Sequence, residues 1–194
     1  VVDDVLKTFE KLEKEDLLYR ANRLVNYCTT CGTAFSDLEV NHQEQTSPLY
    51  FIKYGPLTIA TTRPETRFAD VALAVHPDDE RYQQYVGKTL EVEGLVKTYH
   101  LPVIADEFVD PEFGTGVVKI TPYHDPNDFE FYQRHKNEIP ADPGKTIDYQ
   151  GRLTDLAGKY QGLKAHAARK QIAADLQDKD LLEKTDHKYQ NKIG

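Results

Sequence analysis

Methionine is absent from all 194 residues, position 1 included, so we expect Val1 to begin an internal or processed piece of a longer protein. No apolar run approaches the ~20 residues that span a bilayer, and no signal peptide is visible, so we expect no membrane partner for this chain. The two cysteines, Cys28 and Cys31, are too few for a disulfide framework. We therefore expect an intracellular, reducing environment.

Basic residues are also scarce. The chain has 24 Lys and Arg against 32 Asp and Glu, a formal net charge of −8. Proteins that grip a long stretch of nucleic acid by its phosphates do so with clustered Lys and Arg, so the charge argues against that class. It does not argue against a site that takes only the end of a nucleic acid.

Twelve tyrosines and eight phenylalanines supply most of the bulky core side chains, and the length fits one domain. Hydrophobic periodicity predicts helices, the first of which is amphipathic and is expected to pack on another surface, together with many short strands. The predicted helices are residues 3–16, 126–135 and 163–184, with a short helix beginning within 76–87, and the predicted strands are residues 49–52, 57–61, 71–75, 89–97, 99–104 and 116–121. This pattern indicates an α+β fold class built on a curved sheet or barrel with flanking helices.

The string HDPND at residues 124–128 predicts the start of a helix. Asp125 is a good N-cap, Pro126 suits the first helical position, and Asp128 at the third position also favours the positive end of a helix. This structural role accounts for Asp125 taken alone, and it leaves open whether the two aspartates also bind a ligand.

Lys119 and Thr121 lie just before this helix start. Because side chains alternate along a strand, both point to the same side. A lysine, a hydroxyl and one or two carboxylates would then converge at one strand end. Such a set predicts a polar pocket that can hold an ammonium group on a carboxylate and a hydroxyl on mixed donors and acceptors.

The string TTRPET at residues 61–66 ends another predicted strand. Pro64 favours an extended Arg63, after which a helix or turn begins. Two interpretations stay open: a polar strand end whose hydroxyls cap a helix, or a loop that offers hydroxyls, an arginine and backbone N–H groups to a polar ligand. No Ser-His-Asp or Cys-His set is evident, so we expect no covalent nucleophile.

Together these strings resemble the editing domain inserted in class I aminoacyl-tRNA synthetases of the valyl, isoleucyl and leucyl group. TTRPET is similar to the family's threonine-rich loop, and GTGVVKITPYHDPND to its second editing motif. The resemblance is strongest to the valyl branch. That branch has, in the same order, strings similar to RLVNY, TAFSDLEV, ADVALAVHPDDERY and KAHAARKQ, and Lys119 also favours it. The resemblance covers nearly the whole chain. It departs at Arg67, where methionine is frequent, and at Tyr123, where alanine is frequent.

The resemblance implies the editing-domain fold and post-transfer editing, that is, hydrolysis of mischarged threonyl-tRNA(Val) by a positioned water, with threonyl-adenylate as a further candidate substrate. No HIGH-type or KMSKS-type string is present, so the ATP-using synthetic site is missing from this chain. The implied catalytic residues are Lys119, Asp125 and Asp128. Asp128 would bind the substrate ammonium, while Asp125 and Lys119 would read the side-chain hydroxyl or orient the water.

The implied substrate-binding residues come from both motifs and the loop before the second. They are Thr61, Thr62, Arg63, Glu65, Phe113, Thr121 and His124. Arg63 with the two threonines would hold the terminal adenosine and ribose, and Phe113 and Thr121 would shape the pocket. Editing of this kind implies no cofactor.

The implied partners are the threonine-carrying 3′ end of tRNA(Val) and the rest of the synthetase, in the cytoplasm. We expect residues 1–45 to be a flanking segment that leads into and out of the insertion, 46–150 to be the editing core, and 151–194 to be a C-terminal helical segment that returns to the synthetase body. Two alternatives stay open: an isoleucyl- or leucyl-type editing domain, and a non-catalytic module that binds a tRNA 3′ end.

The pair Cys28 and Cys31 has the spacing of a zinc knuckle, but zinc normally takes four ligands and the nearest histidine, His42, has no companion. The resemblance suggests that some relatives carry a second cysteine pair just past this chain's end. We therefore expect two free or partly ligated thiols here, with a zinc-stapled structural module as the remaining alternative.

Overall fold

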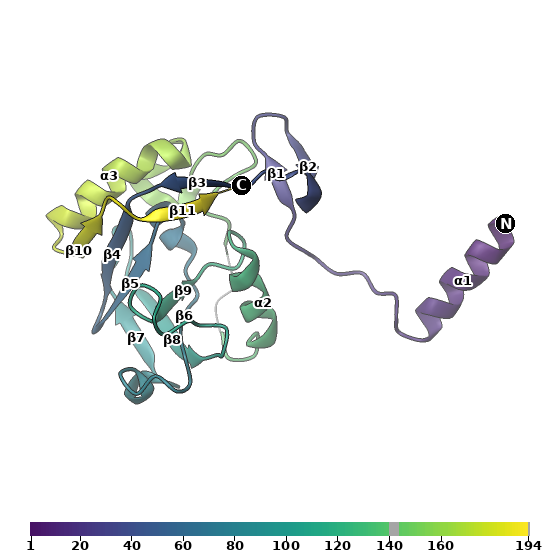
Figure 1. The fold of residues 1–194 in the computed structure, drawn as a ribbon, viewed down its shortest axis with the longest axis horizontal. Coiled ribbons are helices and arrows are strands. Elements are labelled where there is room, and N and C mark those ends of the chain that lie inside the picture. The colour runs from purple at the N-terminus through teal and green to yellow at the C-terminus, as the bar shows by residue number, and fades with distance from the viewer. Residues whose placement is uncertain (140–143, 194) are drawn as a thin grey trace.

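The computed structural model describes residues 1–139 and 144–193. In this part of the chain the helices are α1 (Val2–Lys14), η1 (Asp37–Glu39), η2 (Pro64–Ala69), η3 (Gln83–Tyr85), α2 (Pro126–Arg134), η4 (Asp155–Tyr160) and α3 (Ala165–Asp178), where η marks a 3-10 helix (Figure 1). The strands are β1 (Asn26–Cys28), β2 (Thr33–Phe35), β3 (Gln43–Thr46), β4 (Leu49–Tyr54), β5 (Leu57–Thr61), β6 (Ala72–Val75), β7 (Thr89–Val92), β8 (Tyr99–Ala105), β9 (Val117–Ile120), β10 (Leu182–Asp186) and β11 (Gln190–Ile193). No helix among these is long and apolar enough to cross a membrane.

The described strands form four sheets, in the orders β1-β2, β10-β4-β5, β11-β3 and β7-β8-β6-β9. β6 runs parallel to β8, and the other neighbours are antiparallel. The mixture of helices and short strands confirms the α+β prediction. Of the two core forms expected, the closed barrel is not found, because these sheets stay separate over the described residues.

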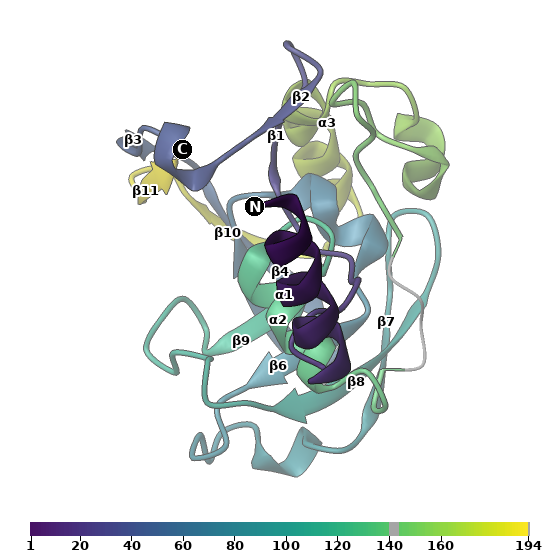
Figure 2. The same ribbon diagram turned by 90° about the vertical axis from the view of Figure 1, so that its right-hand side faces the viewer.

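Two apolar clusters hold the sheets in place. In the first, α3 covers the β4-β5 sheet, and Ile52, Ile59 and Ile172 are fully buried there. In the second, α2 lies against β6 and β9, with Ile120 and Phe131 fully buried. Figure 2 shows these helices and strands turned by 90° from the view of Figure 1. The packing fixes the end of β9 and the start of α2, where the predicted polar pocket lies.

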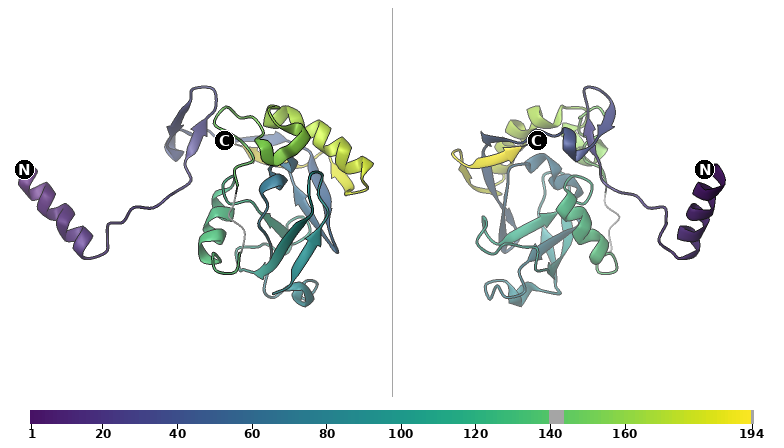
Figure 3. Two further views of the ribbon diagram at one scale, coloured as in Figure 1. Left: turned by 180° about the vertical axis from the view of Figure 1, so that it is seen from behind. Right: turned by 45° about the vertical axis from the view of Figure 1, so that its right-hand side comes forward.

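The first helix forms as predicted, but among the described residues no surface packs against it. Val5, Leu6 and Phe9 on its apolar side are between 57% and 60% exposed, and α1 buries none of its residues. Figures 1 and 3 show α1 standing away from the other elements.

Two expected boundaries are corrected, and three strands were not predicted. The helix predicted over 163–184 ends at Asp178, because the chain turns at Asp180 (φ +56°) and Leu182 then enters strand β10 beside β4. The strand predicted over 89–97 ends at Val92. A tight turn follows, in which a Cβ on Gly94 would lie 2.3 Å from the carbonyl oxygen of Lys97. Strands β3, β10 and β11 were not predicted, because none shows a clear alternation of apolar and polar residues. β3 is polar throughout, and β10 and β11 each contain a single apolar residue, at one end.

Candidate functional site

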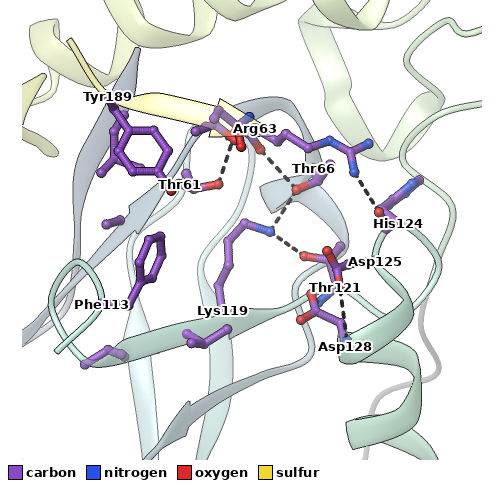
Figure 4. A pocket seen from close by; sticks show the side chains of 16 residues that line it. Thr61, Arg63, Thr66, Phe113, Lys119, Thr121, His124, Asp125, Asp128 and Tyr189 are labelled. Carbon is purple, nitrogen blue, oxygen red and sulfur yellow. Dashed lines mark hydrogen bonds between the residues drawn. The ribbon is translucent and has the colours of Figure 1, made fainter. Parts of the chain in front are cut away.

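The two motifs come together at one pocket. Strands β5 and β9 pack side by side, so η2 after β5 and α2 after β9 begin around a cavity of about 220 Å³ (Figure 4). Nine of the ten predicted site residues line it, which are Thr61, Thr62, Arg63, Phe113, Lys119, Thr121, His124, Asp125 and Asp128. The tenth, Glu65, is buried behind it.

Asp125 caps α2, as the sequence predicted. Its Oδ1 accepts hydrogen bonds from the backbone N–H groups of Asn127 (2.8 Å) and Asp128 (3.4 Å), and Pro126 takes the first helical position. Capping and pocket lining are compatible, because the cap uses only one carboxylate oxygen.

Asp128 is a buried carboxyl group at the pocket floor, 7% exposed. Its Oδ2 accepts a hydrogen bond of 2.8 Å from the backbone N–H of Thr121. Burial raises the pKa of Asp128 to about 7, and the neighbouring Asp125 adds to the rise while Lys119 opposes it. A cation placed beside this group would stabilise its ionised form.

Lys119 is held by three acceptors of the protein itself. Its Nζ donates to the hydroxyl of Thr66, at 2.8 Å, and to that of Thr121. It also forms an ion pair with Asp70, at 3.2 Å from Oδ1. An ammonium has three N–H groups, so in this arrangement each has an acceptor.

Asp70 was missed by the sequence analysis. Besides Lys119, its carboxylate accepts hydrogen bonds from Thr121 Oγ1 (2.7 Å) and from the hydroxyl of Tyr54 (2.6 Å). Its position in the sequence, between the TTRPET motif and a predicted buried strand, could have indicated a site residue. Thr66, Tyr189 and Asn191 also line the pocket and were not predicted. Only the folded chain brings β11 and its preceding turn to this wall.

Arg63 is anchored on two sides. Its Nη1 donates a 2.6 Å hydrogen bond to the backbone carbonyl of His124, and its Nε lies 3.8 Å from Glu65 Oε1. The same Glu65 oxygen accepts from Arg169 Nη2 of α3 at 2.7 Å. Glu65 is 1% exposed, so it supports Arg63 from behind rather than facing the cavity.

His124 is a neutral imidazole in this fold. Its Nε2 accepts a 2.9 Å hydrogen bond from the backbone N–H of Thr146, which places the proton on Nδ1. Burial, followed by the charges of Arg63, Lys119 and Lys145, lowers the pKa of His124 to about 3. It is therefore a wall of the pocket and not a proton carrier near neutral pH.

Two aromatic rings meet edge to face at the other end of the pocket. Phe113 and Tyr189 have ring centroids 6.1 Å apart at an interplanar angle of 65° (Figure 4). Phe113 is 45% exposed, so its ring is open to a ligand.

Cys28 and Cys31 are both free thiols in the structure. The backbone N–H of Cys31 lies 3.3 Å from Cys28 Sγ, and this contact lowers the pKa of the Cys28 thiol. Across residues 1–139 and 144–193 no cluster of three or more His, Cys, Asp or Glu side chains fits a metal ion. These residues do not make a four-ligand zinc site.

Comparison with known proteins points in one direction. The family model described as tRNA synthetases class I (I, L, M and V) matches residues 1–136. Similar proteins include the valine–tRNA ligase of Thermotoga maritima, 43% identical over 98% of this chain and 22% of that protein. The valine–tRNA ligases of Carboxydothermus hydrogenoformans (47%) and Clostridium perfringens (48%) align over 93% of this chain and 20% of theirs. The chain thus spans about a fifth of the length of these curated relatives.

Proposed function

Because this chain belongs to the class I tRNA synthetase family of the I, L, M and V enzymes, we propose that it edits for a valine–tRNA ligase. It hydrolyses the ester of mischarged threonyl-tRNA(Val). The observation that carries the proposal is the buried carboxyl of Asp128, which faces a small pocket beside the polar cluster of Lys119, Asp70 and Thr121.

A synthetic pocket shaped for valine needs such a second site. An apolar pocket discriminates weakly against an isostere that adds a hydroxyl, and valine against threonine is the standard example of that limit. The second site must accept threonine and refuse valine. A methyl group set against the carboxylate oxygen of Asp125 that does not cap α2 would leave that oxygen without a partner, at a cost of roughly 1–3 kcal/mol.

Asp128 binds the α-ammonium of the substrate. Among the described residues only its Oδ2 accepts a hydrogen bond, from Thr121, and Oδ1 is left for the ligand. An ammonium there offsets the burial that raises the pKa of Asp128, so binding and ionisation support each other. Asp125 and the Lys119 cluster read the threonine hydroxyl or orient the water.

The reaction needs no covalent nucleophile. A water oxygen bonds to the ester carbonyl carbon, the bond from that carbon to the ribose oxygen breaks, and a water proton passes to the ribose oxygen. The products are threonine and tRNA with a free terminal hydroxyl. An aminoacyl ester is already reactive, so fixing water and ester in place supplies much of the rate. Threonyl-adenylate is a second substrate of the same site.

The terminal adenosine occupies the other half of the pocket. The adenine stacks at the Phe113 and Tyr189 rings, which are 6.1 Å apart, because every base offers a π face to aromatic side chains. Arg63, held by His124 and Glu65, binds the ribose together with the hydroxyls of Thr61 and Thr62.

We further propose how the chain is organised. Residues 46–150 form the editing core, residues 1–45 lead into and out of the insertion, and 151–194 return to the synthetase body while completing the pocket wall with Tyr189 and Asn191. The partners are the 3′ end of tRNA(Val) and the rest of the ligase, and the cytoplasm is where this pairing takes place.

The test is deacylation of threonyl-tRNA(Val) by the chain and its Asp128→Asn variant. We expect hydrolysis by the wild type and a loss of at least 100-fold in the variant, because the amide cannot pair with the ammonium. Asp78→Asn is the matched control, because Asp78 is exposed and does not line the pocket. Equal turnover in the Asp128 and Asp78 variants would remove Asp128 from the site.

The same assay decides between the alternatives. Preference for threonyl esters on tRNA(Val) supports the valyl assignment, and preference for a mismatched ester on tRNA(Ile) or tRNA(Leu) supports the other editing types. Binding of the tRNA end without hydrolysis by the wild type would make the chain a non-catalytic module.

A further inference from the structure

A second and larger cavity adjoins the first. It has a volume of about 690 Å³ and lies between the β1–β2 hairpin, the start of α2 and residues 145–154. Arg63, His124 and Asp125 line both cavities. A ligand in the first pocket that extends past Arg63 therefore enters the second.

The second cavity is lined with aromatic rings and cations. Tyr27 and Tyr149 meet edge to face at 5.2 Å, and Tyr149 is 61% exposed. Lys145 Nζ lies 5.0 Å from the Tyr149 ring centroid and 3.2 Å from its hydroxyl. Arg23 adds a further cation to the wall. Rings that carry cations beside them are the surface on which single-stranded nucleic acid stacks.

The acidic residues of this cavity already have partners within the protein. Asp37 accepts a 2.6 Å hydrogen bond from Asn26 Nδ2. Asp148 accepts from the backbone N–H groups of Gln150 and Arg152, at 2.9 and 2.8 Å. These neutral donors stabilise the two carboxylates, and within the described residues no ion pair joins either of them to Arg23, Arg63 or Lys145. Those cations are therefore available to a phosphate.

We propose that the second cavity binds the unpaired nucleotide that precedes the terminal adenosine of the RNA substrate. This proposal rests on the proposed function. The base of this preceding nucleotide stacks on Tyr149. The phosphate between the preceding and the terminal nucleotide lies against Arg63, whose guanidinium is held between the cavities by His124 and Glu65. The chain as a whole carries a net charge of −8, so these local cations, not the overall charge, guide the strand.

The experiment compares two substrates of different length. One is the threonyl ester of adenosine, which fills only the first pocket, and the other is the threonyl ester of a short RNA that ends in CCA. In Tyr149→Ala we expect KM for the RNA ester to rise roughly tenfold relative to that for the adenosine ester, the size expected for the loss of one base–aromatic stack. Tyr149→Phe keeps the ring and should keep the wild-type ratio.

Tyr19→Ala is the matched control, because Tyr19 is 72% exposed and lines neither cavity. An equal rise in KM for both substrates in Tyr149→Ala would overturn the proposal, since the ring would then act on the first pocket or on the fold. An unchanged KM for both would also overturn it.

A binding measurement separates this proposal from the proposed function. If the wild type hydrolyses neither ester, the deacylase assignment fails, and the affinities of unacylated CCA trinucleotide and of adenosine then decide the second cavity. Tighter binding of the trinucleotide, lost in Tyr149→Ala and retained in Tyr149→Phe, supports it. Equal affinities of trinucleotide and adenosine contradict it.

Discussion

Asp128 is the residue on which the proposed ammonium site depends. Its carboxyl is buried at the start of α2, with one backbone N–H donor and Lys119 near it, and burial outweighs both. The group is costly in the ligand-free protein and becomes favourable when an ammonium arrives. The proposed function of Asp128 and its effect on stability therefore both follow from the burial of its carboxyl group.

The raised pKa of Asp128 predicts how stability depends on pH. The pKa rises from its ordinary value near 3.8 to about 7, so the folded state binds the proton more tightly than the unfolded state. The stabilising effect of this proton is fully present below pH 4 and is lost as the pH rises to about 7, roughly 4 kcal/mol in all at 1.36 kcal/mol per pKa unit. Asp128→Asn should lack this loss.

Urea unfolding at pH 5 and pH 7 measures it. Between pH 5 and pH 7 the unfolding free energy of the wild type should fall relative to that of Asp128→Asn. A difference that is the same at both pH values would mean that Asp128 titrates normally.

Lys119 gives a second prediction at this scale. Removing its ammonium in Lys119→Ala releases the hydroxyls of Thr66 and Thr121 and leaves Asp70 without its cation. We expect the ratio of threonyl to valyl ester hydrolysis to fall, because the hydrogen-bonded cluster beside the proposed hydroxyl site is broken. The two deacylation rates on tRNA(Val) give the ratio, and an unchanged value would exclude Lys119 from selection.

At the scale of elements, α3 fixes the TTRPET loop. Helix η2 is buried over its whole length, and α3 packs against it. The link is the pair of Arg169 on α3 and Glu65 on η2, at 2.7 Å, with Glu65 also close to Arg63. The loop that carries four predicted binding residues therefore depends on a helix more than 100 positions later in the chain.

Breaking that pair should be costly. Arg169→Met leaves a buried carboxylate without its main partner, and we expect a loss of about 3 kcal/mol in unfolding free energy. The double variant with Glu65→Gln should recover part of it, since no unpaired charge remains. Lys170→Met, on an exposed neighbour, is the control in urea unfolding. A loss in Lys170→Met as large as that in Arg169→Met would show that the pair is not the cause.

At the scale of the whole molecule, the described chain divides into a packed body and an N-terminal helix that does not pack on it. The two apolar clusters draw on β4 to β10, α2 and α3, and α1 contributes to neither. The apolar side of α1 is exposed, and the helix stands away from the other elements (Figure 3). Stability of the body should therefore be independent of that helix.

Two phenylalanines provide a matched test. Phe131 of α2 is fully buried, and Phe131→Ala should lower the unfolding free energy by roughly 3–5 kcal/mol through lost packing and a cavity. Phe9 of α1 is 57% exposed, and Phe9→Ala should change it by less than about 0.5 kcal/mol. Equal losses in equilibrium unfolding would mean that α1 packs on the body.

The local sequence was enough to predict the features that depend on neighbouring residues. The cap of α2 by Asp125, the Pro64 start of η2 and the common side of Lys119 and Thr121 follow from propensity and alternation, which act over a few residues. For that reason nine of the ten predicted site residues line one pocket.

The tertiary structure decided which groups meet across the chain. Asp70 joins Lys119 across 49 positions, Arg169 joins Glu65 across 104, and Tyr189 reaches Phe113 from the far end. No local pattern encodes such contacts, because they arise only when packing places β5 beside β9 and α3 on η2. The sequence alone determined which polar side chains the two motifs supply. The fold decided that Lys119 pairs with Asp70 and that the carboxyl of Asp128 is buried, because both depend on contacts made across the chain.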